Sequence, residues 1–160
     1  MNDGSRSMIL PGDRPAGNAR GTRSAVLARR GMIATSHPLA SFAGLTVLRD
    51  GGNAVDAAVT AAAVLSVVEP TMTGIGGDLF ALVFVAASGR LHGLNASGRA
   101  GRGADVSAYR ALGHDAVPAR GALSVTVPGV VQGWSDLLVQ HGTVSLARAL
   151  QPAITYALEG

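Results

Sequence analysis

The chain has 160 residues, of which 48% are hydrophobic and only 14% charged, a composition that excludes a disordered protein and suffices for one domain with a core. The absence of cysteine excludes disulfides and cysteine-based metal or redox chemistry. The net charge of +3 comes from the first 30 residues, where six arginines face only Asp3 and Asp13; from residue 31 onward, seven arginines stand against eight acids. The basic character therefore does not indicate a nucleic-acid-binding domain.

Residues 1–30 are rich in Gly, Ser, Pro and Arg, and we expect them to form a flexible extension. This extension is either a solvated tail or a weak electrostatic tether to an acidic surface. Its apolar stretch, Met8 to Leu10, is shorter than the core of a secretory signal. We therefore expect a cytoplasmic protein whose folded domain covers residues 31–160.

The first predicted elements are a short strand over residues 31–36 and a helix that runs to about Arg49. Pro38 suits the first turn of this helix, because its missing N–H would have no partner there. Either Ser36 or His37 is then the N-cap. The glycines that follow Asp50 end the helix.

A second helix is predicted over residues 54–68, with Asn53 as its N-cap and Asp56 in its first turn, where an acid favours the helix dipole. Twelve of these 15 residues are Ala, Val or Leu, so the helix should be covered on most sides, with Val59 and Val64 deeply buried. At 15 residues it is shorter than the roughly 20 residues of a membrane span, and we expect no membrane segment.

The next predicted elements are a hairpin of strands 79–87 and 90–95, a polar loop from residue 97 to about 110, and a strand over 123–127. A helix over residues 130–140 follows. A last helix starts at Ser145, with apolar residues at helical spacing: Leu146, Leu150, Ile154 and Leu158. This alternation predicts a mixed α and β layered fold.

Few residues suggest chemistry by themselves. The glycine-rich run 74–78 lies after a helix and before a strand, the reverse of the order in nucleotide-binding loops, so tight packing accounts for it better than phosphate binding. His37 is either a general base or a capping residue. Asp56, Glu69 and Asp78 could together hold a metal, but no histidine lies at ligand spacing, and we expect neither a metal nor another cofactor.

Three motifs together resemble the start of the gamma-glutamyltransferases: HPLAS at 37–41, GGNAVDAAV at 51–59 and EPTMTGIGGD at 69–78. The resemblance continues from Trp134 to Gly160. It implies an N-terminal-nucleophile hydrolase with a four-layer αββα sandwich, of which this α/β (α+β) chain is the N-terminal portion. Such enzymes are made as one precursor that cleaves itself to free a threonine.

The resemblance places that nucleophilic threonine downstream of Gly160, so no catalytic residue is expected in this chain. The implied partners are a small-molecule substrate such as glutathione, the rest of the precursor with its small subunit, and a second copy of the processed enzyme. No nucleic-acid partner is expected. The chain's own threonines in the resembling region, such as Thr71 and Thr126, are internal.

The segment Ser97-Gly98-Arg99 bears on the substrate. Gamma-glutamyltransferases usually carry an arginine at the position of Ser97, where it binds the substrate's α-carboxylate through two hydrogen bonds, and an acid at the position of Gly98. Here Arg99 comes two residues late. We expect Ser97 and Arg99 to be substrate-binding residues, with Arg99 either contacting a carboxylate or pairing with a nearby acid.

Three functions follow from the resemblance. The first is transfer or hydrolysis of gamma-glutamyl amides. The second is hydrolysis of other amides, such as β-lactam side chains, because Asn-x-Ser-Gly-Arg-Ala at 95–100 resembles the acylase-like branch of the family. The third is a non-catalytic scaffold or binding module that has lost self-cleavage.

Overall fold

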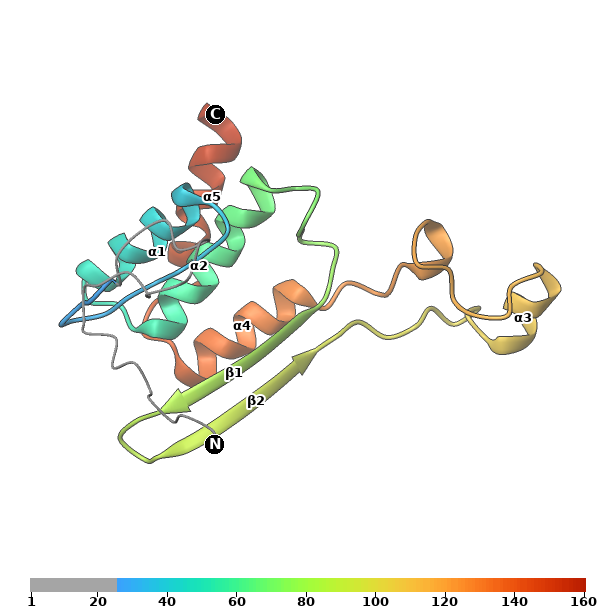
Figure 1. Cartoon of the computed structure of the whole chain (residues 1–160), viewed down its shortest axis with the longest axis horizontal. Helices are drawn as coiled ribbons and strands as arrows, with labels where there is room; N and C mark the ends of the chain where they lie inside the picture. The colour runs from blue at the N-terminus through green and yellow to red at the C-terminus, as the bar shows by residue number, and fades with distance from the viewer. Residues whose placement is uncertain (1–25) are drawn as a thin grey trace, which may run out of the picture. The chain divides into compact units, whose positions relative to one another are not determined.

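The structure is a computed structural model that describes residues 26–160. The chain divides into two compact units, Met1–Met32 and Ile33–Gly160. Residues 26–32 of the first unit form neither helix nor strand, and the rest of the expected extension lies outside the described residues. All helices and strands below belong to the second unit (Figure 1). Among the described residues, none of the helices combines the length and the hydropathy that a bilayer span requires.

The predicted strand at 31–36 is wrong, because residues 31–35 have no regular structure. This segment makes side-chain hydrogen bonds to the start of the first helix in place of the backbone hydrogen bonds of a strand. The Thr35 hydroxyl donates to the His37 carbonyl at 2.7 Å and lies 2.7 Å from the Ser41 hydroxyl. Among residues 26–160, the apolar and β-branched residues of this segment have no neighbouring strand to pair with.

Helix α1 (Pro38–Arg49) has His37 as its N-cap, whose Nδ1 accepts a hydrogen bond from the Leu39 N–H at 3.2 Å. The capping role predicted for this histidine is confirmed. The helix stops at Asp50, and Gly51 follows with φ of +96°, a conformation that costs glycine little. Both ends of α1 thus follow from local sequence.

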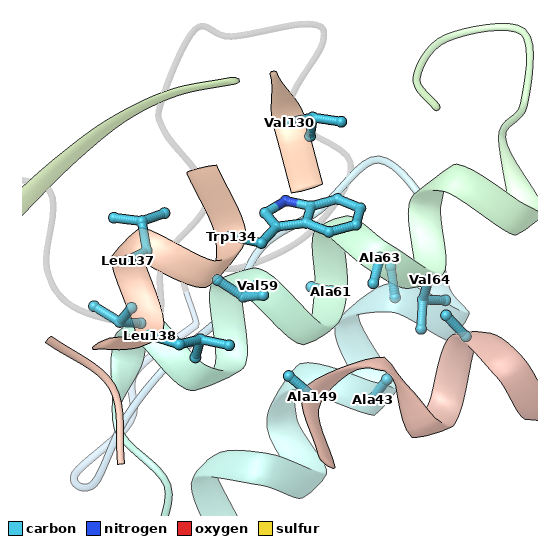
Figure 2. Packing of buried hydrophobic residues seen from close by; sticks show 13 residues of the cluster. Ala43, Val59, Ala61, Ala63, Val64, Val130, Trp134, Leu137, Leu138 and Ala149 are labelled. Atoms are coloured by element: carbon cyan, nitrogen blue, oxygen red, sulfur yellow. The ribbon is translucent and has the colours of Figure 1, made fainter. Parts of the chain in front are cut away.

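Helix α2 (Ala54–Val68) is the centre of the unit. Helices α1 and α5 pack against it, and α4 lies between α2 and the hairpin (Figure 1). Val59 and Val64 are 1% and 0% exposed, as predicted. Figure 2 shows Val59 facing Trp134, Leu137 and Leu138 of α4. The small residues let the helices approach closely: a Cβ on Gly44 of α1 would lie 3.0 Å from the Ala57 carbonyl oxygen.

Strands β1 (Leu79–Val85) and β2 (Arg90–Ala96) form the predicted hairpin, antiparallel and in register from Leu79 opposite Ala96 to Val85 opposite Arg90. One face packs on α4, where a Cβ on Gly133 would lie 2.6 Å from the Ala96 Cβ. The other face is apolar and is exposed, with no helix or strand over it among residues 26–160. It carries four residues that are more than 60% exposed: Phe80, Leu82, Phe84 and Leu91.

Residues 97–129 leave the hairpin and return to α4 with little regular structure. They contain the short helix α3 (Val106–Ala111) and the 3₁₀ turn η1 (Ala122–Ser124). The predicted strand at 123–127 is therefore wrong. Its β-branched residues form no ladder within the described part of the chain, and Val127 donates one isolated backbone hydrogen bond, to the Arg99 carbonyl at 2.9 Å.

Helices α4 (Val130–His141) and α5 (Leu146–Glu159) complete the unit and confirm the two predicted C-terminal helices. Ser145 caps α5 by accepting a hydrogen bond from the Arg148 N–H at 3.2 Å. The buried contacts of α5 come from Ala149 and Ala153, whereas Leu158, which continues the apolar spacing, is 81% exposed.

Candidate functional site: the Asp78 junction

Three segments distant in sequence meet at one end of the hairpin, where β1 begins, β2 ends and α4 begins (Figure 1). They are residues 77–78, 96–99 and 126–129, and we call their meeting point the Asp78 junction. The backbone N–H groups of Gly129 and Val130 both donate to the Gly77 carbonyl at 3.1 Å. The glycine-rich run 74–78 therefore holds the start of α4 through its backbone, consistent with the packing role predicted for it.

The carboxylate of Asp78 joins the other two segments. Its Oδ1 accepts a hydrogen bond from the Gly98 N–H at 2.6 Å and one from the Thr126 hydroxyl at 3.0 Å. The Val127 N–H donates in turn to the Arg99 carbonyl. The loop after β2 is thus held from one side by a charged acceptor and from the other by a backbone bond.

The glycines of the junction are required by close backbone approach. A Cβ on Gly98 would lie within 2 Å of the Val127 carbonyl oxygen, and a Cβ on Gly129 would lie 2.2 Å from the Ala96 carbonyl oxygen. Neither position can hold a side chain unless the backbone moves. The loop containing Gly98 is therefore fixed by its neighbours as well as by Asp78.

The two predicted substrate-binding residues lie on this loop with their side chains exposed. The Ser97 N–H donates to Asn95 Oδ1 at 2.9 Å, which turns the chain at the end of β2. Arg99 contributes its carbonyl to the junction. Within residues 26–160 its guanidinium makes no ion pair, so the pairing with a nearby acid that we considered is not observed there.

The three acids considered as metal ligands serve separate purposes. Asp56 is buried at the start of α2, Glu69 accepts a hydrogen bond from the Ser36 hydroxyl at 2.5 Å, and Asp78 holds the junction. In the part of the chain that the structure describes, no three metal-ligating side chains form a group.

Sequence reasoning named Asp78 but missed its role. The signal was present: an acid directly after Gly76-Gly77 and directly before a strand has its carboxylate at a turn where backbone N–H groups lack partners. Its partners lie 20 and 48 residues further along the chain.

Asp56 is the most completely bonded acid of the described chain. Burial tends to raise its pKa, but hydrogen bonds from the Thr143 hydroxyl and from three backbone N–H groups outweigh that effect and leave the pKa below its ordinary value. The Thr143 hydroxyl is 2.6 Å from Oδ2, and the Thr143 N–H is 2.8 Å from Oδ1. Asp56 therefore fixes the link between α4 and α5 to the start of α2.

Asp105 also has a lowered pKa, because the Ser107 hydroxyl and the Ala108 N–H donate to it. It is the N-cap of α3, in an exposed position. Its role is local capping, and it does not contact the junction.

An apolar groove of about 260 Å³ runs between α2 and β1. Val59, Trp134 and the apolar side chains of β1 line it. Trp134 Nε1 is buried and has no hydrogen-bond partner within residues 26–160. Buried indole N–H groups normally have a hydrogen-bond partner, so the described chain lacks the acceptor expected for Trp134 on this side of β1.

Residues 40–160 match the sequence profile of the gamma-glutamyltranspeptidase family. The chain belongs to this family. It is 44% identical over 136 residues to the glutathione hydrolase-like YwrD proenzyme of Bacillus subtilis, an alignment that covers 84% of this chain and 26% of that protein. The chain thus spans about a quarter of the length of this curated relative.

Two solved structures show the same fold. The gamma-glutamyltranspeptidase of Helicobacter pylori has a TM-score of 0.74 at 35% identity, covering 81% of this chain and 38% of that one. The cephalosporin acylase of Bacillus halodurans also has a TM-score of 0.74, at 44% identity, covering 87% of this chain and 27% of that one. The expected mixed α/β fold of N-terminal-nucleophile hydrolases is confirmed, and the chain corresponds to the N-terminal part of the large subunit.

Proposed function

We propose that this chain is the N-terminal part of the large subunit of an enzyme that hydrolyses or transfers gamma-glutamyl amides, with glutathione as the type of substrate. The observation that carries the proposal is the family match over residues 40–160 together with 44% identity to a glutathione hydrolase-like proenzyme. The apolar groove beside β1, where the buried Trp134 N–H has no partner among residues 26–160, is consistent with a protein that has further strands.

In the proposed reaction, the nucleophile is a threonine at the start of the small subunit, downstream of this chain. Its hydroxyl attacks the amide carbon while its own α-amine takes the hydroxyl proton. The amide C–N bond breaks, the leaving nitrogen takes up the proton, and an acyl-enzyme ester remains. Water or the amine of an amino acid then attacks the ester and releases the threonine hydroxyl.

The contribution of this chain is to bind the substrate beside that threonine. Arg99 is the proposed ligand of the substrate's α-carboxylate, because its guanidinium is exposed and has no ion pair within the described residues. A planar guanidinium suits a carboxylate through two parallel hydrogen bonds. Ser97 lies on the same loop and is proposed to donate a hydrogen bond to the same end of the substrate.

The remainder of the precursor is proposed to cover the outer face of the hairpin and the free edge of β1. Phe80 and Leu82 are 68% and 77% exposed there, and an uncovered apolar face beside an unpaired strand edge is rarely left in water. The proposal further includes a folded domain that starts near residue 31, a cytoplasmic location, and a dimer of the processed enzyme. Cell fractionation and light scattering would check the last two.

The test uses the full-length protein that continues this chain, with a control in which the downstream nucleophilic threonine is replaced by alanine. We expect the wild-type precursor to split into two polypeptides and to release nitroaniline from gamma-glutamyl-p-nitroanilide, and the control to do neither. Self-cleavage with turnover of cephalosporin side-chain amides in place of the gamma-glutamyl anilide would identify an acylase. Failure to cleave itself or any of these amides would indicate a non-catalytic scaffold.

A further inference from the structure

We propose that Asp78 is a positioning residue that holds the loop 97–99 in the orientation needed to present Ser97 and Arg99 to the substrate. The inference rests on the proposed function of that loop. Asp78 is outside the loop, and it acts on the substrate only through the hydrogen bonds that it accepts from Gly98 and Thr126.

The first support is that one carboxylate oxygen joins both sides of the loop. The Gly98 N–H lies between the two proposed substrate-binding residues, and its 2.6 Å hydrogen bond to Asp78 Oδ1 fixes the backbone from which both side chains project. The Thr126 hydroxyl, 3.0 Å from the same oxygen, orients the carboxylate.

The second support is that the loop has few other contacts to hold it. Ser97 and Arg99 are exposed, so no buried apolar side chain anchors the segment. Gly98 lies against the Val127 carbonyl without room for a Cβ, and that contact alone limits movement in one direction only. Apart from the bond of the Ser97 N–H to Asn95 Oδ1 and the bond of the Val127 N–H to the Arg99 carbonyl, Asp78 supplies the directional hold.

The third support concerns the size of the expected effect. A substrate-binding group displaced by about 1 Å can cost an enzyme roughly a hundredfold, even when the altered residue is distant from the reacting atoms. Where the displaced group binds substrate and transition state alike, the loss appears in KM. Removing the Asp78 acceptor also leaves the Gly98 N–H without a partner from the described chain, which favours a different loop conformation. Asp78 therefore sets the geometry of carboxylate recognition without contacting the substrate.

The test compares Asp78→Ala and Asp78→Asn in the full-length protein. Asparagine keeps an acceptor oxygen at the same place, whereas alanine removes it. We expect Asp78→Ala to raise KM for gamma-glutamyl-p-nitroanilide about tenfold or more with little loss of kcat, and Asp78→Asn to stay within about threefold of the wild type. If Asp78→Asn behaves like Asp78→Ala, the negative charge and not the positioning acceptor matters, and the proposal is overturned.

A second measurement does not depend on activity. The chain has no lysine, so trypsin cuts it at arginines, and cleavage after Arg99 reports the opening of the loop. We expect Asp78→Ala to speed this cleavage about tenfold relative to cleavage after Arg120. Asp105→Ala is the matched control, because it removes an exposed carboxylate with two similar hydrogen bonds and should leave cleavage after Arg99 unchanged.

The two measurements separate the two proposals. An inactive wild type in which Asp78→Ala still loosens the loop would reject the proposed function while keeping the positioning role. Unchanged cleavage after Arg99 and unchanged KM in Asp78→Ala would reject the positioning role, whatever the substrate. Thr126→Val should reproduce part of the Asp78→Ala effect. Thr126→Ser should behave like the wild type, because serine keeps the hydroxyl that orients Asp78.

Discussion

Arg99 is an exposed guanidinium on a loop whose backbone is held at three consecutive residues. The Ser97 N–H bonds to Asn95, the Gly98 N–H bonds to Asp78, and the Arg99 carbonyl bonds to Val127. The backbone is ordered while the side chain has no ion pair within the described chain. Such an arrangement suits a ligand-binding residue, because the protein loses little backbone entropy when the side chain meets its ligand.

We predict that Arg99→Ala in the full-length protein raises KM for gamma-glutamyl substrates by roughly ten- to 150-fold. This range corresponds to the loss of a charge-assisted contact of about 1.5–3 kcal/mol. Self-cleavage should be unaffected, because it needs no free substrate. Arg102→Ala, three residues further along and also exposed, is the matched control. Glutathione turnover that is equal in the wild type and in Arg99→Ala would show that this loop does not bind the carboxylate.

At the scale of single residues, the sequence predicts where the candidate site lies but not how it is built. Ser97 and Arg99 stand out because they depart from a family pattern at a strand end. The contact between Asp78 and Gly98 could not be predicted, because it depends on the register that places Leu79 opposite Ala96. Thr126 is more distant still and reaches Asp78 only through an irregular segment.

Among the secondary-structure elements, the long helices are predicted well from the sequence and isolated strands are not, and the short helix α3 lies partly in the predicted polar loop. Helix ends depend on neighbours a few residues away, such as His37 at α1 and the reciprocal bonds of Asn53 and Asp56 at α2. A strand depends on a second strand that pairs with it, and the local sequence does not identify that partner. The hairpin is predicted correctly because its two strands are adjacent, whereas residues 31–36 and 123–127 have strand-like composition and no partner strand in the described chain.

Helix α2 should be the element least tolerant of substitution. We predict that Val64→Asp prevents folding of the full-length protein, because Val64 is 0% exposed and an unpaired charge in the core costs several kcal/mol, a large share of a domain's stability of about 5–15 kcal/mol. Soluble yield, circular dichroism and self-cleavage would measure it. Ala54→Asp, at the exposed first residue of the same helix, should fold. A soluble and processed Val64→Asp protein would show that α2 is peripheral.

The stability of the contact between the start of α2 and the link from α4 to α5 should depend on pH through Asp56. Its pKa in the folded protein is lowered relative to about 3.9 in the unfolded chain. The ionised carboxylate therefore stabilises the fold at pH values above about 4, and this contribution is lost as the pH falls through the lower pKa of the folded state.

We predict that Asp56→Asn lowers the melting temperature at pH 7, through a loss of about 1–3 kcal/mol from mismatched hydrogen bonds, and weakens the fall in stability below pH 4. Melting temperatures of wild type and variant between pH 3 and 7 would test this. Asp115→Asn, at an exposed position, is the control and should follow the wild-type curve. Parallel pH profiles for Asp56→Asn and the wild type would contradict the assignment.

The described chain is a helical layer with one two-stranded sheet, whose outer face is exposed and whose two outer edges have no partner strand among residues 26–160. The chain spans about a quarter of the length of a curated relative. We predict that the purified 160-residue chain alone releases no nitroaniline from gamma-glutamyl-p-nitroanilide above a buffer blank, because the nucleophile is proposed to lie downstream. Measurable release by the chain alone would require a nucleophile among its own residues.

The same uncovered surface should control how the isolated chain behaves in solution. Phe80, Leu82 and Phe84 lie on one face of β1 and are all more than 60% exposed, and the strand's second edge has no partner among the described residues. Apolar faces and open edges of this kind associate with other copies. We predict that light scattering will show oligomers or aggregates of the isolated chain, and that Leu82→Lys raises the monomer fraction by placing a charge in the middle of the face.

Val139→Lys is the matched control, because Val139 is similarly exposed at 82% but lies on α4, and it should leave the association unchanged. A monodisperse wild-type monomer with a sharp thermal transition would show that the hairpin face needs no covering chain.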